Sequence, residues 1–189
     1  IVDSLCYLAN EYKLDGFRFD LMGLLDIHTL NTAAEKLRRI NPSIILYGEG
    51  WTGGKSPLPE RLRAMKKNTV KLPQYAMFSD DFRDGVKGSV FEDEECGYVN
   101  GNASELSEMM KSVISGGIYR MDVQRKRSEC WTDTPQQTVN YVEAHDNLTL
   151  FDKLRISMPE ASGQERVSVD KLAAALVFLS EGIPFMQAG

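Results

Sequence analysis

The chain has 189 residues, of which 42% are hydrophobic and 26% are charged, a balance typical of a globular protein with a large core. It carries 22 basic against 27 acidic residues, and the net charge of −5 argues against nucleic acid as a partner. No apolar run approaches the roughly 20 residues that a membrane-spanning helix requires, so no membrane partner is predicted either.

Three cysteines, Cys6, Cys96 and Cys130, are scattered along the chain without the spacing of zinc ligands. Their odd number favours unpaired thiols over a disulfide framework, and no metal site is predicted. The sequence opens with IVDSLCYLANEY, whose apolar residues recur at helical spacing. A natural chain rarely starts inside a helix without a methionine, so we expect this segment to come from inside a longer protein. Its cellular location is left open.

The next predicted elements are a strand, a helix and a second strand. The strand is expected at 15–21 and the helix at 27–40, where Asn41-Pro42 ends it because proline disfavours the helical conformation of the preceding residue. The second strand, 43–50, is a run of apolar residues, which is typical of a parallel strand buried on both faces. Residues 51–73 are expected to form a loop with a basic helical piece, RLRAMKK, as a solvated face.

The rest of the chain continues the alternation of strands and helices. It is predicted to contain a strand at 74–80, a short helix at 81–90, a loop at 91–103, a helix at about 103–115, a polar connection that includes RKRSECW, a strand at 138–144, a helix from about 148, a helix at 168–180 and the start of a strand at 183. This alternation favours a parallel sheet wrapped in helices, which is an α/β fold.

The spacing of the predicted strands bears on the kind of α/β fold. The first two strand-to-strand intervals are about 30 residues, the length of a βαβ unit. Periodicity alone does not separate a doubly wound sheet from an eight-stranded barrel. A complete barrel takes about 250 residues, so five strands in this chain would be the latter part of one.

Three of the predicted strands end on acidic residues, Asp20, Glu49 and Asp146. The carboxyl ends of parallel strands meet at one edge, where functional sites are built, so we expect these acids to converge there. Arg18 lies two residues before Asp20 and on the same face of its strand, where it would stabilise and orient the aspartate. Each acid taken singly has an alternative as a helix cap or turn residue. Only the joint pattern is specific.

Two neighbouring carboxylates beside a cleft are the equipment of glycoside hydrolysis, in which one attacks the sugar and the other first donates and later accepts a proton. Glu49 is the better acid, because Trp51 beside it would lower the local polarity and raise the pKa of its carboxyl. Asp20, held by Arg18, would stay ionised and is the better nucleophile. The alternative for Trp51 is a place in the core.

Asp146 would bind sugar hydroxyls and favour the positively charged transition state, with His145 beside it as a hydroxyl donor. The alternative for His145 is a structural histidine bonded to a backbone carbonyl. The charged run at 80–84 is expected to form helix caps and local ion pairs. His28, near a helix start, is assigned no role.

The motifs around these residues resemble a known family. DGFRFDLMG, ILYGEGW and VNYVEAHDN, in this order, resemble three consecutive motifs of the α-amylase superfamily of glycoside hydrolases. Within it, LMG after the aspartate, GEGW, and EAHDNLTLFDKL are most similar to the type I pullulanases, which are debranching enzymes. FSDDFRDGVKGSVFEDEECGYVNGN is similar to the pullulanase segment after the sixth barrel strand, and EGIPFMQAG resembles the start of the eighth. The resemblance covers essentially the whole chain.

The resemblance implies a partial (β/α)8 TIM barrel, roughly strands 4 to 8 with their helices. Residues 1–189 would be the C-terminal portion of the catalytic domain, without strands 1 to 3 and without accessory domains. It also implies retaining hydrolysis of α-1,6-glucosidic branch linkages in pullulan, amylopectin or dextrins derived from glycogen. The implied partner is therefore an α-glucan polysaccharide or oligosaccharide.

The family's functional residues map onto this chain by motif. Asp20 matches the nucleophile, Glu49 the general acid/base and Asp146 the aspartate that stabilises the transition state. The resemblance further gives Arg18 and His145 a place at the sugar next to the cleaved bond, and Trp51 a place at the border of the cleft, stacking on glucose.

The resemblance implies no organic cofactor. The acid-rich loop at 92–95 offers a position for a structural calcium ion, although solvated charge is the simpler interpretation. Two other functions remain as alternatives: another enzyme of the superfamily, such as an isoamylase or an α-amylase, and an inactive carbohydrate-binding or structural fragment.

Overall fold

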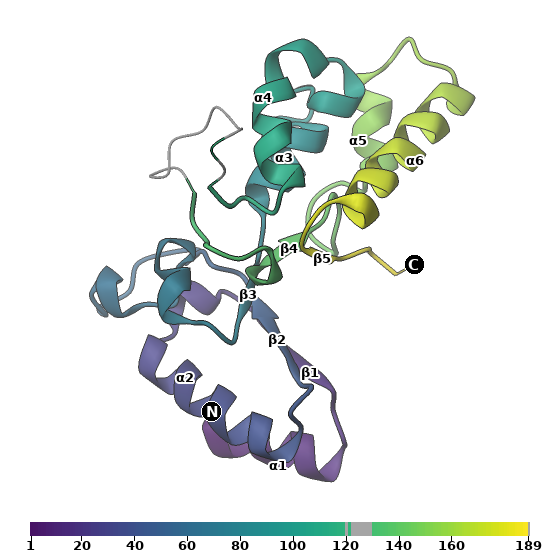
Figure 1. The fold of residues 1–189 in the computed structure, drawn as a ribbon. Coiled ribbons are helices and arrows are strands. Elements are labelled where there is room, and N and C mark those ends of the chain that lie inside the picture. Colours follow the sequence, from purple (N-terminus) through teal and green to yellow (C-terminus); the bar gives the residue numbers. More distant parts are fainter. Residues whose placement is uncertain (120, 122–129, 189) are drawn as a thin grey trace. The chain divides into compact units, whose positions relative to one another are not determined.

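The computed structural model describes residues 1–119, 121 and 130–188, and residues 120 and 122–129 of the predicted polar connection lie outside the described residues. The chain forms two compact units, Ile1–Phe78 and Ser79–Gly189 (Figure 1). Each unit combines helices with parallel strands, so the predicted α/β class is confirmed, and a partial barrel is consistent with it. Within the described part of the chain, no helix is long and apolar enough to cross a membrane.

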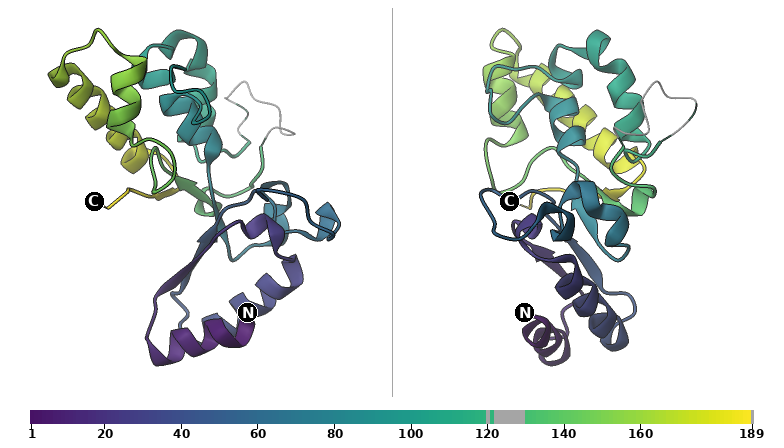
Figure 2. Two further views of the ribbon diagram at one scale, coloured as in Figure 1. Left: turned by 180° about the vertical axis from the view of Figure 1, so that it is seen from behind. Right: turned by 90° about the vertical axis from the view of Figure 1, so that its left-hand side faces the viewer.

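The first unit contains two α-helices and three strands. They are α1 (Val2–Glu11), β1 (Gly16–Phe19), α2 (Ile27–Ile40), β2 (Ile45–Gly48) and β3 (Ala76–Phe78). β2 pairs in parallel with both β1 and β3, and α1 and α2 pack side by side (Figures 1 and 2). Short 3-10 helices at Met22–Leu24 (η1), Glu60–Leu62 (η2) and Lys66–Lys71 (η3) connect these elements.

Helix α2 has the boundaries that its sequence predicts. The carboxylate of Asp26 caps its first turn by accepting the N–H of Thr29 at 2.7 Å. Hydrogen bonds from the side chain and the backbone of Thr29 lower the pKa of Asp26. The buried residues recur every three or four positions, at Leu30, Ala33, Ala34 and Leu37. The helix ends at Ile40, just before Asn41-Pro42.

Two predictions for the first unit are wrong. β2 is not buried on both faces: Leu46 is buried, but Ile45, which points to the opposite face, is 54% exposed. The basic piece at 61–67 is not one solvated helix, because Arg63 and Ala64 are buried. The N–H of Ala64 donates to the carbonyl of Leu25 at 2.9 Å, which holds this stretch against the connection between β1 and α2.

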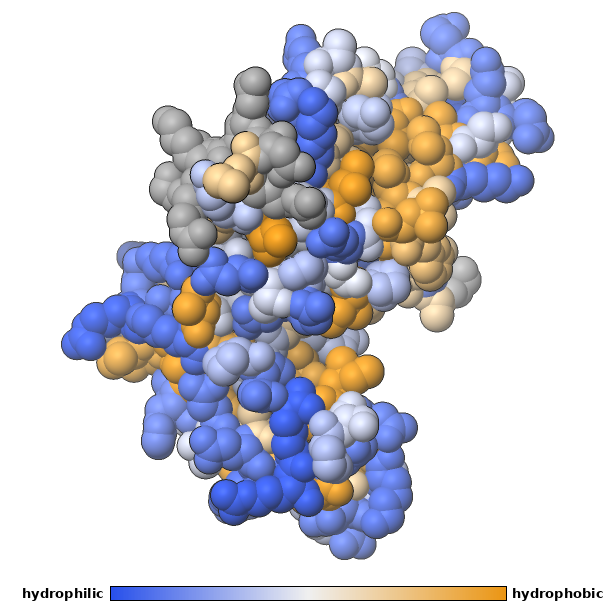
Figure 3. Space-filling view, viewed as in Figure 1, coloured by the Kyte–Doolittle hydropathy of each residue, from blue (hydrophilic) through white to orange (hydrophobic). Residues whose placement is uncertain are grey.

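The second unit contains four α-helices and two strands among its described residues. They are α3 (Asp80–Lys87), α4 (Ala103–Ile114), β4 (Thr138–Asn140), α5 (Leu150–Ser157), α6 (Gly163–Leu179) and β5 (Ile183–Pro184), with 3-10 helices at Tyr98–Asn100 (η4) and Pro135–Gln137 (η6). β4 and β5 pair in parallel. The helices enclose one core, made of Phe82, Val86, Met110, Val113, Val142, Leu150, Leu154, Ala173 and Val177. α6 also exposes apolar side chains (Figure 3). Leu179, the last residue of this helix, is 84% exposed.

Several boundaries in the second unit differ from prediction. α3 ends at Lys87 rather than 90. β4 ends at Asn140 rather than 144, and at this end the N–H of Phe185 donates to the carbonyl of Asn140 at 2.9 Å. α6 begins at Gly163 rather than 168, because Ser162 and Glu165 form a capping box. Cys6 and Cys96 carry free thiols, as predicted for them.

Candidate active site

The ends of β1 and β2 bring one arginine and two carboxylates together. β1 and β2 pair with Phe19 beside Gly48, so Asp20 and Glu49 follow the two strands at the same level. Arg18 donates from Nη1 to Oδ1 of Asp20 at 2.7 Å and from Nη2 to Oε1 of Glu49 at 2.5 Å. Because both nitrogens belong to one guanidinium, the two carboxylates are neighbours. The predicted contact between Arg18 and Asp20 is confirmed, and the contact with Glu49 is an addition that the sequence does not predict.

The two carboxylates have different surroundings. The side chain of Asp20 is 71% exposed, whereas Glu49 is buried with 6% of its surface accessible. The second oxygen of Glu49, Oε2, accepts the N–H of Leu21 at 2.8 Å, and Leu21 adopts a left-handed backbone conformation (φ 41°) that turns the chain at this point. Asp20 is therefore open to a substrate, and Glu49 is fixed by bonds to both of its oxygens.

Glycines flank Glu49 because other groups approach the backbone there. A Cβ at Gly48 would lie 2.5 Å from the carbonyl oxygen of Phe19, and one at Gly50 would lie 2.7 Å from Sδ of Met77. Both distances are too short for a side chain to fit without movement of a neighbour. The Gly-Glu-Gly sequence thus permits the close packing that places the Glu49 carboxylate.

The sequence allows Trp51 either a place in the core or one at the border of the cleft, and the structure gives it an intermediate burial. Its indole is half-buried, and its ring centroid lies 6.5 Å from that of Phe78 with the planes at 42°. Its backbone carbonyl accepts the N–H of Gly23 at 3.2 Å. The contact with Phe78 anchors the ring and part of its surface stays accessible. Stacking on glucose remains a prediction.

His145 and Asp146 lie in the second unit, on the loop between β4 and α5. Their side chains are 63% and 67% exposed, and Nε2 of His145 is 3.6 Å from Oδ2 of Asp146. They come five and six residues after the end of β4, and not directly after a strand as predicted. The expected convergence of Asp146 with Asp20 and Glu49 remains a prediction, as do the roles of all six residues.

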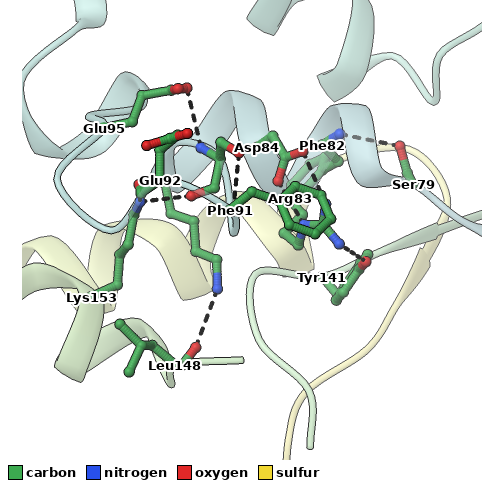
Figure 4. Close-up of polar contacts among 12 residues, drawn as sticks. Ser79, Phe82, Arg83, Asp84, Phe91, Glu92, Glu95, Tyr141, Leu148 and Lys153 are labelled. Atoms are coloured by element: carbon green, nitrogen blue, oxygen red, sulfur yellow. Dashed lines mark hydrogen bonds and ion pairs between the residues drawn. The ribbon is translucent and has the colours of Figure 1, made fainter. Parts of the chain in front are cut away.

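The charged run at the start of α3 forms a local ion pair, as predicted, but the helix cap comes from Ser79, which precedes the run. Oγ of Ser79 accepts the N–H of Phe82 at 3.2 Å (Figure 4). Arg83 binds both carboxylate oxygens of Asp84, at 2.6 and 2.9 Å, and donates from Nη1 to the hydroxyl of Tyr141 at 2.9 Å. Burial raises the pKa of Tyr141 to about 12, so its hydroxyl stays protonated.

Two buried lysines are features that the sequence does not predict. Lys87, on α3, is 1% exposed, and its Nζ lies 3.4 Å from the carbonyl oxygen of Leu148. Lys153, on α5, is equally buried, and its Nζ donates to the carbonyls of Ser89 and Glu92 at 2.7 and 2.6 Å (Figure 4). Lysine side chains are usually exposed, so their positions in the sequence carried no signal of burial.

The acid-rich loop at 92–95 already has a cation beside it. The ammonium of Lys153 binds the backbone carbonyl of Glu92 in this loop and that of Ser89 just before it. A side-chain oxygen of Glu95 accepts the N–H of Ser89 at 3.2 Å. Over residues 1–119, 121 and 130–188, the structure gathers no group of three or more histidine, cysteine, aspartate or glutamate side chains that could hold a metal ion.

A separate hollow of about 730 Å³ opens in the first unit. Leucines from η1, η2 and the 51–59 loop line it together with polar side chains that include His28, Arg61 and Lys71. Arg18, Asp20 and Glu49 are not part of its wall. His28, to which the sequence assigns no role, therefore lines this hollow and not the carboxylate pair.

An α/β chain with paired carboxylates at adjacent carboxyl ends of parallel strands has the arrangement of enzymes that build their sites at that edge. No protein-family model matches the chain. Pullulanases from bacteria and from a plant do match it along its whole length. The pullulanase of Bacillus subtilis strain 168 is 36% identical over 189 residues, which are all of this chain and 25% of that protein.

Solved structures agree with this similarity. A pullulanase from Anoxybacillus sp. LM18-11, complexed with maltotetraose, is 41% identical with a TM-score of 0.90, over 100% of this chain and 26% of that one. Type I pullulanase from Bacillus subtilis, complexed with maltose, is 36% identical with a TM-score of 0.91, over 98% of this chain and 25% of that one. The chain is thus homologous along its length to an internal part of pullulanases and spans about a quarter of them.

Proposed function

We propose that the chain is part of the catalytic domain of a pullulanase-type glycoside hydrolase. The full protein would hydrolyse α-1,6-glucosidic branch linkages in pullulan, amylopectin or dextrins derived from glycogen, with retention of anomeric configuration. The observation that carries the proposal is the bridge of Arg18 between Asp20 and Glu49, since it pairs an exposed with a buried carboxylate at adjacent strand ends. The similarity to pullulanases, including ones complexed with maltose and maltotetraose, supports an α-glucan as the substrate.

In the proposed reaction, Asp20 attacks the anomeric carbon and forms a glycosyl ester, while Glu49 gives its proton to the leaving oxygen. Water then cleaves the ester, with Glu49 taking a proton from it. The exposure of Asp20 suits a group that must reach the sugar, and the bond to Arg18 orients it. Glu49, fixed by Arg18 and by the Leu21 N–H, suits a group that acts twice from one position. We expect the two carboxyl groups to lie about 5–5.5 Å apart in a retaining enzyme.

The remaining site residues would act on the sugar. Asp146 would bind hydroxyls and favour the transition state, His145 would donate to a hydroxyl, and Trp51 would stack on glucose at the border of the cleft. We further propose that residues 1–189 supply strands 4 to 8 of a (β/α)8 barrel, in the C-terminal portion of the catalytic domain. The share of about a quarter of the pullulanases supports such a partial domain. No organic cofactor enters this reaction.

The deciding experiment is hydrolysis of pullulan by the full-length protein and by its Asp20→Asn and Glu49→Gln variants. Maltotriose as the product, and its loss in both variants, would support the proposal. Cleavage of α-1,4 linkages alone would replace it with an α-amylase. Cleavage of branches in amylopectin or glycogen with pullulan left intact would favour an isoamylase. Glycan binding that survives Asp20→Asn, without hydrolysis by the unmodified protein, would favour a carbohydrate-binding or structural role.

A further inference from the structure

His145 and Asp146 lie on the loop between β4 and α5, and their exposed side chains do little to fix the backbone of this loop. Both side chains are largely exposed, and among the described residues they approach each other, with Nε2 of His145 3.6 Å from Oδ2 of Asp146. Asn147, directly after Asp146, has a left-handed backbone conformation with φ of 65°. The position of Asp146 must therefore depend on groups that fix the two ends of this loop.

Glu143 closes the loop across its base. Its Oε2 accepts the backbone N–H of Leu150 at 2.7 Å. Leu150 is the first residue of α5, and its N–H is one of the helix donors that have no partner inside the helix. Leu150 is also buried in the core of the second unit together with Val142. The bond between Glu143 and Leu150 thus joins the two anchored ends of the segment 144–149.

Lys87 reaches the same loop from α3. Its Nζ lies 3.4 Å from the carbonyl oxygen of Leu148, and its own carbonyl accepts the side-chain N–H of Asn100 at 3.2 Å. Burial lowers the pKa of Lys87 to about 8, as does the neighbouring Arg83, while Glu143 opposes this shift. A buried ammonium is costly unless negative charge or a carbonyl oxygen faces it. The charge of Glu143 and the carbonyl of Leu148 therefore stabilise the buried ammonium of Lys87.

We propose that Glu143 and Lys87 are positioning residues, which act through the backbone of the 144–149 loop to hold His145 and Asp146 where the substrate binds. The inference rests on the proposed function only in giving Asp146 its catalytic role. Neither residue touches the substrate in this scheme. Displacing a catalytic group by about 1 Å can cost up to a hundredfold in rate, so losing either anchor should act on turnover.

The first test is hydrogen exchange in the full-length protein, which needs no activity. Glu143→Ala and Lys87→Met should both speed exchange in peptides that cover 144–150, while peptides from α4 stay unchanged. Glu143→Gln keeps a side-chain oxygen for the Leu150 N–H and should keep its protection. Lys153→Met is the matched control: it removes an equally buried lysine that binds the carbonyls of Ser89 and Glu92, so it should loosen 89–95 and spare 144–150.

The second test is steady-state hydrolysis of pullulan, well below the unfolding temperature of each variant. Glu143→Ala should lower kcat at least tenfold with a smaller change in KM, Glu143→Gln should restore most of kcat, and Lys153→Met should leave kcat unchanged. Unchanged exchange at 144–150 in both Glu143→Ala and Lys87→Met would overturn the proposal, as would faster exchange there with kcat unaltered. If the unmodified protein fails to hydrolyse any α-glucan, the proposed function fails, and the exchange data alone decide whether the two residues hold the loop.

Discussion

Nη2 of Arg18 lies 2.5 Å from Oε1 of Glu49, although 31 positions separate the two residues in the sequence. The same guanidinium binds Asp20 through Nη1 at 2.7 Å. A single arginine on β1 therefore sets the geometry of two carboxylates on neighbouring strands. A lysine cannot reproduce this arrangement, because its ammonium is a point charge without the planar fork of a guanidinium.

Replacing Arg18 by lysine should therefore reduce activity and leave the fold intact. Hydrogen bonds to charged groups contribute about 1.5–3 kcal/mol each, so we expect kcat/KM on pullulan to fall by roughly 10- to 100-fold. Arg155→Lys is the control, because Arg155 is an exposed arginine of α5 whose partner is Asp152. Equal activity of the Arg18→Lys and unmodified proteins would show that the bridge does not matter for the reaction.

Gly48→Ala should destabilise the protein, because its Cβ would lie 2.5 Å from the backbone oxygen of Phe19. Overpacking of this kind costs about 1–3 kcal/mol. Gly54→Ala is the matched control, since no atom lies within 4 Å of a Cβ there and its φ is not positive. Urea midpoints of the two variants should separate them, and a Gly48→Ala protein as stable as Gly54→Ala would contradict the close approach.

Lys87 should make stability depend on pH. Its pKa is about 8 in the folded protein and about 10.5 when unfolded, so the unfolded chain binds more protons between these values. The contribution of Lys87 to the free energy of unfolding therefore rises with pH across this window. Relative to Lys87→Met, the unmodified protein should gain roughly 2 kcal/mol between pH 7.5 and 9.5, by urea unfolding.

The control for this pH dependence is Lys111→Met. Lys111 is an exposed lysine of α4 that pairs with Glu108, so its removal should change stability equally at both pH values. If the difference between the unmodified protein and Lys87→Met is also the same at pH 7.5 and 9.5, then the ammonium of Lys87 is not destabilised by burial.

The 189-residue chain expressed alone should associate. α6 exposes Phe178 and Leu179, and exposed apolar surface of this kind favours contacts between molecules. Light scattering after size exclusion should detect oligomers, and Phe178→Ser with Leu179→Glu should reduce them. Lys171→Ser, on the same helix, should have no such effect. A monodisperse, fully active monomer would contradict this prediction.

Calcium should not be needed at the 92–95 loop, because the ammonium of Lys153 already binds the carbonyls of Ser89 and Glu92. Hydrogen exchange of peptides covering 88–96 in the full-length protein should be the same in EDTA and in millimolar calcium. Slower exchange in calcium would place an ion on this loop. In the Lys153→Met variant the same peptides should exchange faster in both conditions.

Elements were predictable from the sequence where their ends carry local signals. α2 has a capping aspartate at one end and Asn41-Pro42 at the other, and its bounds match the prediction. α6 carries a capping box at Ser162 and Glu165, yet its buried and exposed residues follow no clear periodicity, so its start was placed too late. β4 was predicted too long because Tyr141 and Val142 are buried without being paired, and a run of apolar residues does not show where pairing stops.

The candidate site was predictable only where the residues in contact are close in the sequence. The spacing of Arg18 and Asp20 gives their contact, since alternate residues of a strand share a face. The bond from Arg18 to Glu49 depends on strand register and side-chain conformation, which no short motif contains. The burial of Lys87 and Lys153 depends on carbonyl oxygens about 60 residues away, at Leu148 and at Ser89 and Glu92, and leaves no trace in the local pattern.

The shared guanidinium has a consequence for the two halves of the proposed reaction. As long as Asp20 is a free carboxylate, it competes with Glu49 for the positive charge of Arg18. Once Asp20 has formed the ester with the sugar, it no longer carries a negative charge and that competition ends. Arg18 then interacts with Glu49 alone, in the step in which Glu49 accepts a proton from water. One side chain would thus serve each step in turn, and its change of partner would follow from the chemistry at Asp20.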